Sequence, residues 1–307
     1  MTIDPGSSST AEVSANRKLI MVCGAARSGT TMLDLMLGNA DDALSTGEIY
    51  ALFRPFRVHH WNPVCSCGEV NCAAWRGLLD VPERDFHANI LRTRPDINYV
   101  VDSSKDLRWV LDSNVWANDA GIPVENVVLW KNPIELSYSY WRRGESVSHY
   151  RDEFVKYYGR LLNLKLPFVA VNYKQLAIDT EATLELLCNR LGIGYTVSRV
   201  NFWEKRHHHF FGSAGTRRQV GKQGSSIQYN EDYPDEFNAL FTQELAWMDK
   251  DENFLEIVAE LKARDVSREA VISDIEYLSK PRPVWYFRHA LKAFFRKRFP
   301  ERSLVVE

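Results

Sequence analysis

Residues 19–31 read LIMVCGAARSGTT, and this stretch decides the fold that the sequence predicts. LIMVC (19–23) is a short apolar run without alternation, which is typical of a strand buried on both faces in a parallel sheet. The Gly-rich segment GAARSGTT (24–31) follows, and TMLDLMLGN (31–39) then has helical periodicity. We therefore expect a strand, a loop and a helix in that order.

Three further segments have the same character. INYVVDSS (97–104), NVVLWKN (126–132) and LPFVAVNY (166–173) each read as a buried strand that ends in polar residues and leads into a helical pattern. Strands that alternate with helices predict an α/β protein: a P-loop-like three-layer fold with a central parallel sheet flanked by helices. Ligands of such sheets bind at the carboxyl ends of the strands.

Length and charge exclude several classes of protein. The 307 residues are 45% hydrophobic and 25% charged, enough for a full core. The 38 Lys and Arg residues balance 40 Asp and Glu residues, so no overall basic charge favours nucleic-acid binding. The polar N-terminus lacks the apolar core of a signal peptide, and no apolar run reaches 18 residues. We expect a cytoplasmic protein with no nucleic-acid partner.

Composition divides the chain into unequal parts. Residues 1–17 are Ser-rich and predict a disordered tail. A domain is expected over 18–280, within which 49–96 form an irregular insertion on the acceptor side. The segment 281–307 predicts a basic aromatic helix, and its residues 284–298 could lie on an anionic membrane surface or pack against the domain.

The Gly-rich loop predicts an anion site. It follows a strand and opens a helix, so its N–H groups and the helix N-terminus form a cradle for a phosphate or sulfate. The nucleotide-triphosphatase pattern G-x4-G-K-[ST] fits in spacing, but Thr30 stands in place of the lysine that neutralises the β and γ phosphates. The cation is instead Arg27, within the loop. A kinase is therefore disfavoured.

Arg27-Ser28-Gly29-Thr30-Thr31 resembles the 5′-phosphosulfate-binding loop of sulfotransferases that use 3′-phosphoadenosine 5′-phosphosulfate (PAPS). The resemblance implies that these five residues bind the 5′ side of the donor.

A second motif carries the same resemblance. Family members hold the 3′-phosphate with a basic residue at a strand end and a serine eight positions later, and here Lys131 and Ser139 have that spacing. The family usually has arginine where this chain has lysine.

A third match lies further along the chain. VNYKQL (171–176), followed by LGI (191–193), is similar to the family segment whose tyrosine lies near the adenine, which implies that role for Tyr173. A stretch rich in Gly, Ser, Arg and His from about 203 to 232 has no clear period and predicts a long loop, the late loop, which lies where family members often close over the nucleotide. We name Arg217 as a candidate contact there and leave the other basic residues of 205–222 open.

Sulfuryl transfer needs a base, cations for the leaving phosphate and in-line positioning, but neither a metal nor a covalent intermediate. Glu48 lies 21 residues after Arg27, a spacing similar to that of the base in tyrosylprotein sulfotransferases. Lys105 resembles a lysine that Golgi-type enzymes place against the bridging oxygen of the donor. Asp102 could orient Lys105, although we expect it to cap the next helix.

Histidines are competing candidates for the base, because cytosolic sulfotransferases use one. The competitors are His59, His60 and the run His207-His208-His209, which we expect to be solvated in its polar loop.

Three of the five cysteines are crowded into CSCGEVNC as Cys65, Cys67 and Cys72. A zinc site with His59 or His60 as fourth ligand is conceivable, but C-x-C-x4-C is not a usual zinc spacing and no second CxxC follows. A loop disulfide or simple packing is favoured over metal binding, and no metal is expected.

Together these features predict a sulfotransferase that moves a sulfuryl group from PAPS to a hydroxyl acceptor, with a carbohydrate or glycolipid favoured. A peptide tyrosine or a small phenol or alcohol remains open as acceptor. The rival classes are a P-loop kinase using ATP and magnesium, and a non-enzymatic protein that senses nucleotides or binds carbohydrate.

Overall fold

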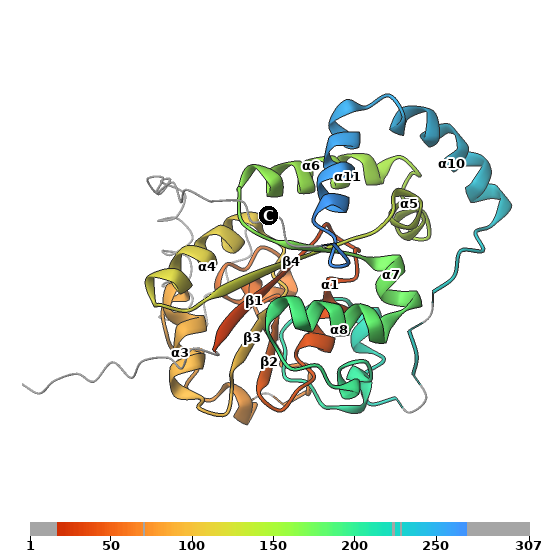
Figure 1. Cartoon of the computed structure of the whole chain (residues 1–307). Helices are drawn as coiled ribbons and strands as arrows, with labels where there is room; N and C mark the ends of the chain where they lie inside the picture. Colours follow the sequence, from red (N-terminus) through yellow and green to blue (C-terminus); the bar gives the residue numbers. More distant parts are fainter. Residues whose placement is uncertain (1–16, 70, 223–224, 228, 269–307) are drawn as a thin grey trace, which may run out of the picture.

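A computed structural model gives the structure of the protein, and it describes residues 17–69, 71–222, 225–227 and 229–268 (Figure 1). Apart from Arg17, the predicted tail lies outside the described residues. The predicted C-terminal helix and its membrane-facing segment 284–298 lie outside them as well.

Five parallel strands form the central sheet in the order β2-β3-β1-β4-β5 (Figure 1). They are β1 (Lys18–Cys23), β2 (Ala43–Gly47), β3 (Tyr99–Asp102), β4 (Val124–Trp130) and β5 (Val169–Asn172). The strand β1 pairs with both β3 and β4, and its apolar side chains point alternately to the two faces. The α/β fold predicted from the sequence is confirmed, including all four predicted strands.

Helices cover both faces of the sheet, which gives three layers. On one face the core contains side chains of α1 (Thr30–Leu37), α7 (Tyr173–Ile178) and α8 (Thr180–Leu191). On the other it contains side chains of α3 (Phe86–Thr93), α4 (Leu107–Asp119), α5 (Pro133–Trp141), α6 (His149–Asn163), α10 (Asp235–Met248) and α11 (Glu252–Ala263).

Shorter elements fill the connections. The region 49–96 contains α2 (Tyr50–Phe53) and three 3₁₀ turns, η1 (Val58–His60), η2 (Ala73–Trp75) and η3 (Glu83–Asp85), before α3 begins. After α8 come η4 (Val197–Arg199) and η5 (Phe202–Glu204), and the late loop that follows contains α9 (Ala214–Arg217).

The strand β2 escaped prediction because its five residues, ALSTG, give little apolar signal. It pairs only with β3, and the late loop extends the sheet at its end. Phe210 N donates to Thr46 O (3.0 Å), and Glu48 N donates to Phe210 O (2.9 Å). Gly47 has a φ of +72°, and a Cβ there would lie 2.1 Å from Phe210 O. A glycine is therefore required where β2 meets the late loop.

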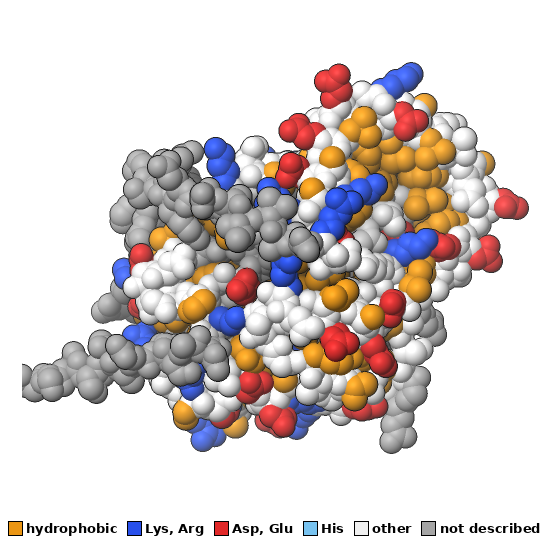
Figure 2. All heavy atoms as spheres, in the orientation of Figure 1, with side chains coloured by type: hydrophobic (Ala, Val, Ile, Leu, Met, Phe, Trp, Pro, Cys, Tyr) orange, Lys and Arg blue, Asp and Glu red, His pale blue; other side chains and the backbone are white. Residues whose placement is uncertain are grey.

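No helix within the described part of the chain is long and apolar enough to cross a membrane. Figure 2 shows acidic and basic side chains interspersed on one face of the molecule, with hydrophobic side chains gathered near α10 and α11. Exposed apolar residues of these helices include Leu240, Leu245 and Leu255.

Asp34 is a carboxyl group inside the core. It lies on α1 with no exposed surface, and Ser45 Oγ of β2 donates to its Oδ2 (2.7 Å). Burial raises the pKa of Asp34 to about 8. The folded protein therefore holds this carboxyl protonated at neutral pH.

This raised pKa predicts the pH dependence of Asp34→Asn. The folded state keeps a proton that the unfolded chain releases above pH ~4, so wild-type stability attributable to Asp34 falls as pH rises from 4 toward 8. Asparagine does not titrate. Between pH 5 and 8, the free energy of unfolding of the variant relative to that of the wild type should therefore increase by roughly 1.4 kcal/mol per pH unit, as measured by urea unfolding. Asp41→Asn, at an exposed carboxylate, is the control, and a pH-independent difference for Asp34→Asn contradicts the prediction.

Candidate functional site

The Gly-rich loop between β1 and α1 adopts a conformation suited to an anion. Arg27 and Gly29 both have positive φ, 73° and 98°, and Gly29 caps α1. Such a backbone directs several N–H groups of the loop toward one point. The first N–H groups of the helix that follows also lack carbonyl acceptors within the helix, so they are available to the same anion. A Cβ on Gly29 would lie 2.8 Å from the Tyr173 ring, so glycine is required here for space as well.

Two tyrosines of α6 hold the outer part of this loop. Tyr157 OH accepts from Gly24 N (3.1 Å), and Tyr158 OH accepts from Ala25 N (3.3 Å). The Tyr158 hydroxyl also contacts Ser28 Oγ (3.0 Å) and donates to Leu129 O of β4 (3.0 Å). The loop is therefore held in shape by buried hydroxyls before any ligand arrives. Sequence reasoning missed both tyrosines, because nothing in their spacing links α6 to the loop.

Arg27 and Ser139, 112 residues apart, meet at the site. Arg27 Nε donates to Ser139 Oγ of α5 (2.9 Å). The next residue of α5, Tyr140, donates its hydroxyl to Ala26 O (3.2 Å). Burial lowers the pKa of Arg27, and the nearby Arg143 lowers it further.

Lys131 follows β4 and joins the same cluster. Its Nζ lies 4.0 Å from the ring centroid of Tyr173, a cation–π contact. Burial lowers the pKa of Lys131 to about 8; Glu135 opposes this effect and Arg27 adds to it. Two cations, a hydroxyl and an aromatic ring are thus gathered beside the Gly-rich loop.

Glu48 and Lys105 form an ion pair across the ends of β2 and β3. Lys105 Nζ donates to Glu48 Oε1, and the two side chains remain 22% and 30% exposed respectively. A hydrogen bond also joins the segments that carry the pair: Tyr50 N, two residues after Glu48, donates to Ser104 Oγ, which precedes Lys105 (3.0 Å). The pair is open to solvent and to an incoming ligand.

Asp102 does not cap the next helix, so that expectation is wrong. Asp106 caps α4 by accepting from Trp109 N (2.9 Å). Asp102 is fully buried and accepts from Ser104 N (2.7 Å) and Trp109 Nε1 (2.8 Å), and it pairs with His87 Nε2 (2.9 Å). It fixes the turn that carries Lys105.

The late loop crosses the start of α1. Ser213 N donates to Thr31 Oγ1 (3.0 Å), and a Cβ on Gly212 would lie 2.9 Å from Thr31 Cγ2. Arg217 Nε is buried and has no hydrogen-bond partner within the described residues. Arg206, by contrast, pairs with Glu69 (2.9 Å). An anion beside Arg217 would satisfy its free donor.

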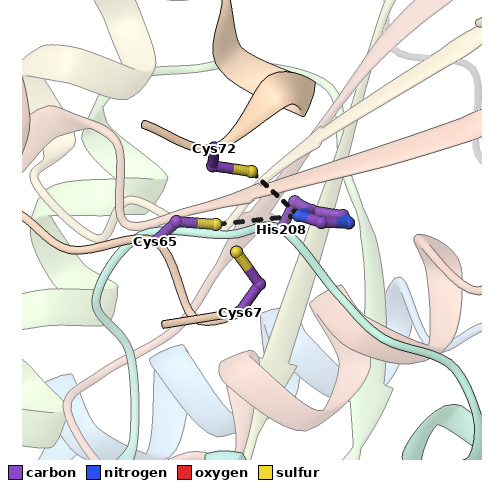
Figure 3. A group of neighbouring side chains, drawn as sticks. All are labelled: Cys65, Cys67, Cys72 and His208. Carbon is purple, nitrogen blue, oxygen red and sulfur yellow. Dashed lines mark hydrogen bonds between the residues drawn. The ribbon is translucent and has the colours of Figure 1, made fainter. Parts of the chain in front are cut away.

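The histidine run is not solvated, so that expectation is also wrong. His207 and His209 are 5% and 0% exposed, and His207 Nε2 pairs with Phe202 O (2.7 Å). His208 faces the side chains of Cys65 and Cys72 (Figure 3).

The other two histidines that could compete for the base role differ in exposure. His60 is buried, and its Nδ1 accepts from Arg57 N (3.2 Å). Burial lowers the pKa of His60, His59 and Arg57 lower it further, and Glu48 opposes them. His59 remains exposed.

The cysteines form no disulfide. All five lie within the described residues and are free thiols. Cys65, Cys67 and Cys72 do lie together, and the histidine that joins them is His208 rather than His59 or His60.

A cleft of about 630 Å³ opens beside Lys105. It lies between α4 and α6, and its charged and hydroxyl-bearing lining includes Arg108, Glu153, Lys156, Tyr157 and Arg160. A second feature near Glu48 is the segment 56–64, in which Phe56, Val58 and Val64 expose apolar side chains.

No family model and no curated protein matches the chain. Solved structures that resemble it are sulfotransferases. The sulfotransferase domain from the curacin biosynthetic pathway matches with a TM-score of 0.48 and 16% identity, over 75% of this chain and 98% of that domain. A sulfotransferase from Alicyclobacillus acidocaldarius matches at 0.44 and 14%, over 83% and 97% of the two chains. Mouse sulfotransferase SULT7A1 complexed with PAP matches at 0.39 and 12%, over 80% and 87%.

The Tyr158 contacts predict a loss of stability and of anion binding in Tyr158→Phe. Without the hydroxyl, Ala25 N and Leu129 O lose a buried partner, which costs about 1–3 kcal/mol. We expect a lower midpoint in thermal unfolding and weaker stabilisation by inorganic sulfate. Tyr150→Phe, on the same helix but away from the loop, is the control. Equal behaviour of the two variants would show that the hydroxyl does not support the loop.

Proposed function

We propose that the protein is a sulfotransferase that moves a sulfuryl group from PAPS to a hydroxyl acceptor. The observation that carries this proposal is the convergence of Arg27, Lys131 and Ser139 beside a Gly-rich loop that lacks the nucleotide-triphosphatase lysine. A donor with phosphate at both its 5′ and 3′ positions needs two anion subsites, and this arrangement supports two.

We infer the following contacts with the donor. Arg27, Ser28, Gly29, Thr30 and Thr31 bind the phosphosulfate, chiefly through the loop amides and the arginine fork. Lys131 and Ser139 bind the 3′-phosphate. The ring of Tyr173, between Gly29 and Lys131, lies beside the adenine, and Arg217 closes over the nucleotide. Donor binding breaks the Arg27–Ser139 hydrogen bond, because Arg27 turns to the phosphosulfate and Ser139 turns to the 3′-phosphate.

The reaction is a direct in-line transfer. Glu48 takes the proton of the acceptor hydroxyl while the oxygen of that hydroxyl forms a bond to sulfur. The bond from sulfur to the bridging oxygen breaks, and its electron pair goes to the 5′-phosphate, where Lys105 and Arg27 stabilise the charge. This chemistry has no step that uses a metal.

The Glu48–Lys105 ion pair suggests how donor binding activates the base. In the free protein the two side chains satisfy each other. The phosphosulfate group carries more negative charge than one carboxylate, so it attracts the ammonium of Lys105 toward the bridging oxygen. Glu48 is then free to accept a proton once the donor is in place.

A carbohydrate or glycolipid is the acceptor that we favour. The cleft beside Lys105 combines charged and hydroxyl-bearing side chains, which suit the hydroxyls of a sugar, with Leu107, Leu111 and Leu164, which suit its apolar faces or a lipid portion. The segment 56–64 exposes further apolar side chains. A peptide tyrosine or a small phenol or alcohol is the alternative. We place the domain at 18–280 with 49–96 on its acceptor side, and the enzyme in the cytoplasm, with 284–298 as a candidate for peripheral membrane contact.

The decisive experiment combines nucleotide binding with turnover in Glu48→Gln. Adenosine 3′,5′-bisphosphate without metal should raise the thermal midpoint of wild type and variant alike, since glutamine leaves both anion subsites intact. Transfer of radiolabelled sulfate from PAPS to a panel of glycan, glycolipid and phenol acceptors should fall by about 10²- to 10⁴-fold in the variant.

Glu256→Gln, at an exposed site on α11, is the matched control and should keep full activity. Stabilisation only by ATP with magnesium would return the kinase alternative. Bisphosphate binding without transfer to any acceptor would favour a nucleotide-sensing protein.

The lowered pKa of Lys131 predicts that affinity for the bisphosphate depends on pH. Above pH 8 the free protein loses the ammonium that pairs with the 3′-phosphate, while the phosphate charge no longer changes. The dissociation constant should therefore rise above pH 8 by as much as about tenfold per pH unit. Lys131→Arg keeps its charge and should show a flat profile in titration calorimetry from pH 7 to 9.5. A flat wild-type profile removes Lys131 from the phosphate site.

A further inference from the structure

We propose that Cys65, Cys67, Cys72 and His208 bind one zinc ion at a structural site. Their ligand atoms, three Sγ and a ring nitrogen, all lie within 4.8 Å of one another (Figure 3). His208 Nδ1 lies 3.0 Å from Cys72 Sγ and 3.8 Å from Cys65 Sγ. This inference does not depend on the activity proposed above.

The spacing and the donor set both fit zinc. Zn–S bonds of about 2.3 Å and Zn–N bonds of about 2.0 Å place the corners of a tetrahedron roughly 3.5–3.8 Å apart. The observed separations need only small side-chain rotations to reach these values. Three thiolates and one imidazole form a Cys₃His set, which is typical of closed structural sites. Binding releases the thiol protons to solvent and involves no change of oxidation state.

The backbone brings the three cysteines together. Gly68 N donates to Cys65 O (2.8 Å), and Gly68 has a φ of +84°, so the chain turns sharply over residues 65–68 and brings Cys65 and Cys67 close together. Cys65 and Cys72 are buried, whereas Cys67 and His208 are partly exposed. The cluster is therefore near the surface, where an ion can enter.

The fourth ligand comes from a distant part of the chain. His208 lies 136 residues beyond Cys72, and hydrogen bonds already align the two segments. Ser66 N donates to His209 O (2.9 Å), and Ser66 Oγ donates to His207 O (2.7 Å). Arg206 also donates to Cys67 O (3.0 Å), which adds a third hydrogen bond between the cysteine segment and the late loop.

The proposed ion would fasten the insertion to the late loop. Two residues after His208, Phe210 pairs with the end of β2 and holds the backbone of Glu48. Three residues further on, Ser213 contacts Thr31 at the start of α1. A metal at His208 would therefore restrain the segment that lies over both the Gly-rich loop and the ion pair of Glu48.

The test measures metal in the full chain, purified without an affinity tag under reducing conditions. We expect about one zinc per chain by elemental analysis. Chelation should lower the thermal midpoint, and added zinc should restore it. Replacement by Co²⁺ should give thiolate-to-cobalt charge transfer and the intense visible bands of tetrahedral cobalt.

Variants separate this site from adventitious binding. Cys72→Ser and His208→Ala should lose the zinc, and His208→Cys should keep it because Cys₄ is also a structural zinc set. Cys188→Ser, at a buried thiol outside the cluster, and His59→Ala, at the histidine suggested by proximity in sequence, should retain it. If Cys72→Ser is insoluble, the wild-type zinc and cobalt measurements still decide.

Three results would overturn the proposal. The first is wild-type protein that carries no zinc and gives no tetrahedral cobalt spectrum. The second is zinc that persists in soluble His208→Ala or disappears in His59→Ala. The third is titration of only three free thiols in protein prepared without reductant, because it would indicate a disulfide in the cluster.

Discussion

The parallel pairing of β1 with both β3 and β4 is the constraint on which the site depends. Because all five strands run in one direction, their carboxyl ends meet at one edge. The Gly-rich loop, Glu48, Lys105, Lys131 and Tyr173 each follow the end of a different strand. The sheet thereby brings together residues that are spread over more than 140 positions of the sequence. The helices on both faces bury the strands and make this register rigid.

The positive charge gathered at that edge has a cost in the absence of a ligand. Burial lowers the pKa of both Lys131 and Arg27; Arg27 lowers that of Lys131 further, and Arg143 lowers that of Arg27 further. Part of the cost is offset by the Tyr173 ring over Lys131 and by Ser139 beside Arg27. Lys105 is instead neutralised by Glu48. An anionic ligand would relieve the repulsion between Arg27 and Lys131, and it would compete with Glu48 for Lys105.

Sequence patterns predicted the features that depend on local order. The buried strands, the anion loop and the spacing of Lys131 and Ser139 are all set within segments of ten or so residues. The strand β2 was missed because it is held by neighbours, namely β3 and Phe210, rather than by its own apolar side chains. Asp102 was misassigned because its partners, His87 and Trp109, come from helices on either side of it.

The composition of the cysteine cluster could not be predicted either, because it depends on a residue that is distant in sequence. Three cysteines in one short loop lack a fourth ligand nearby in sequence, and the two histidines closest to them point elsewhere: His60 into the aromatic rings of Phe56 and Phe211, and His59 toward solvent.

The missing ligand, His208, is brought in by the late loop, which also supplies Phe210 to β2 and Ser213 to α1. One segment of seven residues, 207–213, thus links the insertion, the end of β2 and the start of α1. A restraint at its first residues would reach the backbone of Glu48 through the hydrogen bonds of Phe210, and the start of α1 through the hydrogen bond from Ser213 N to Thr31 Oγ1.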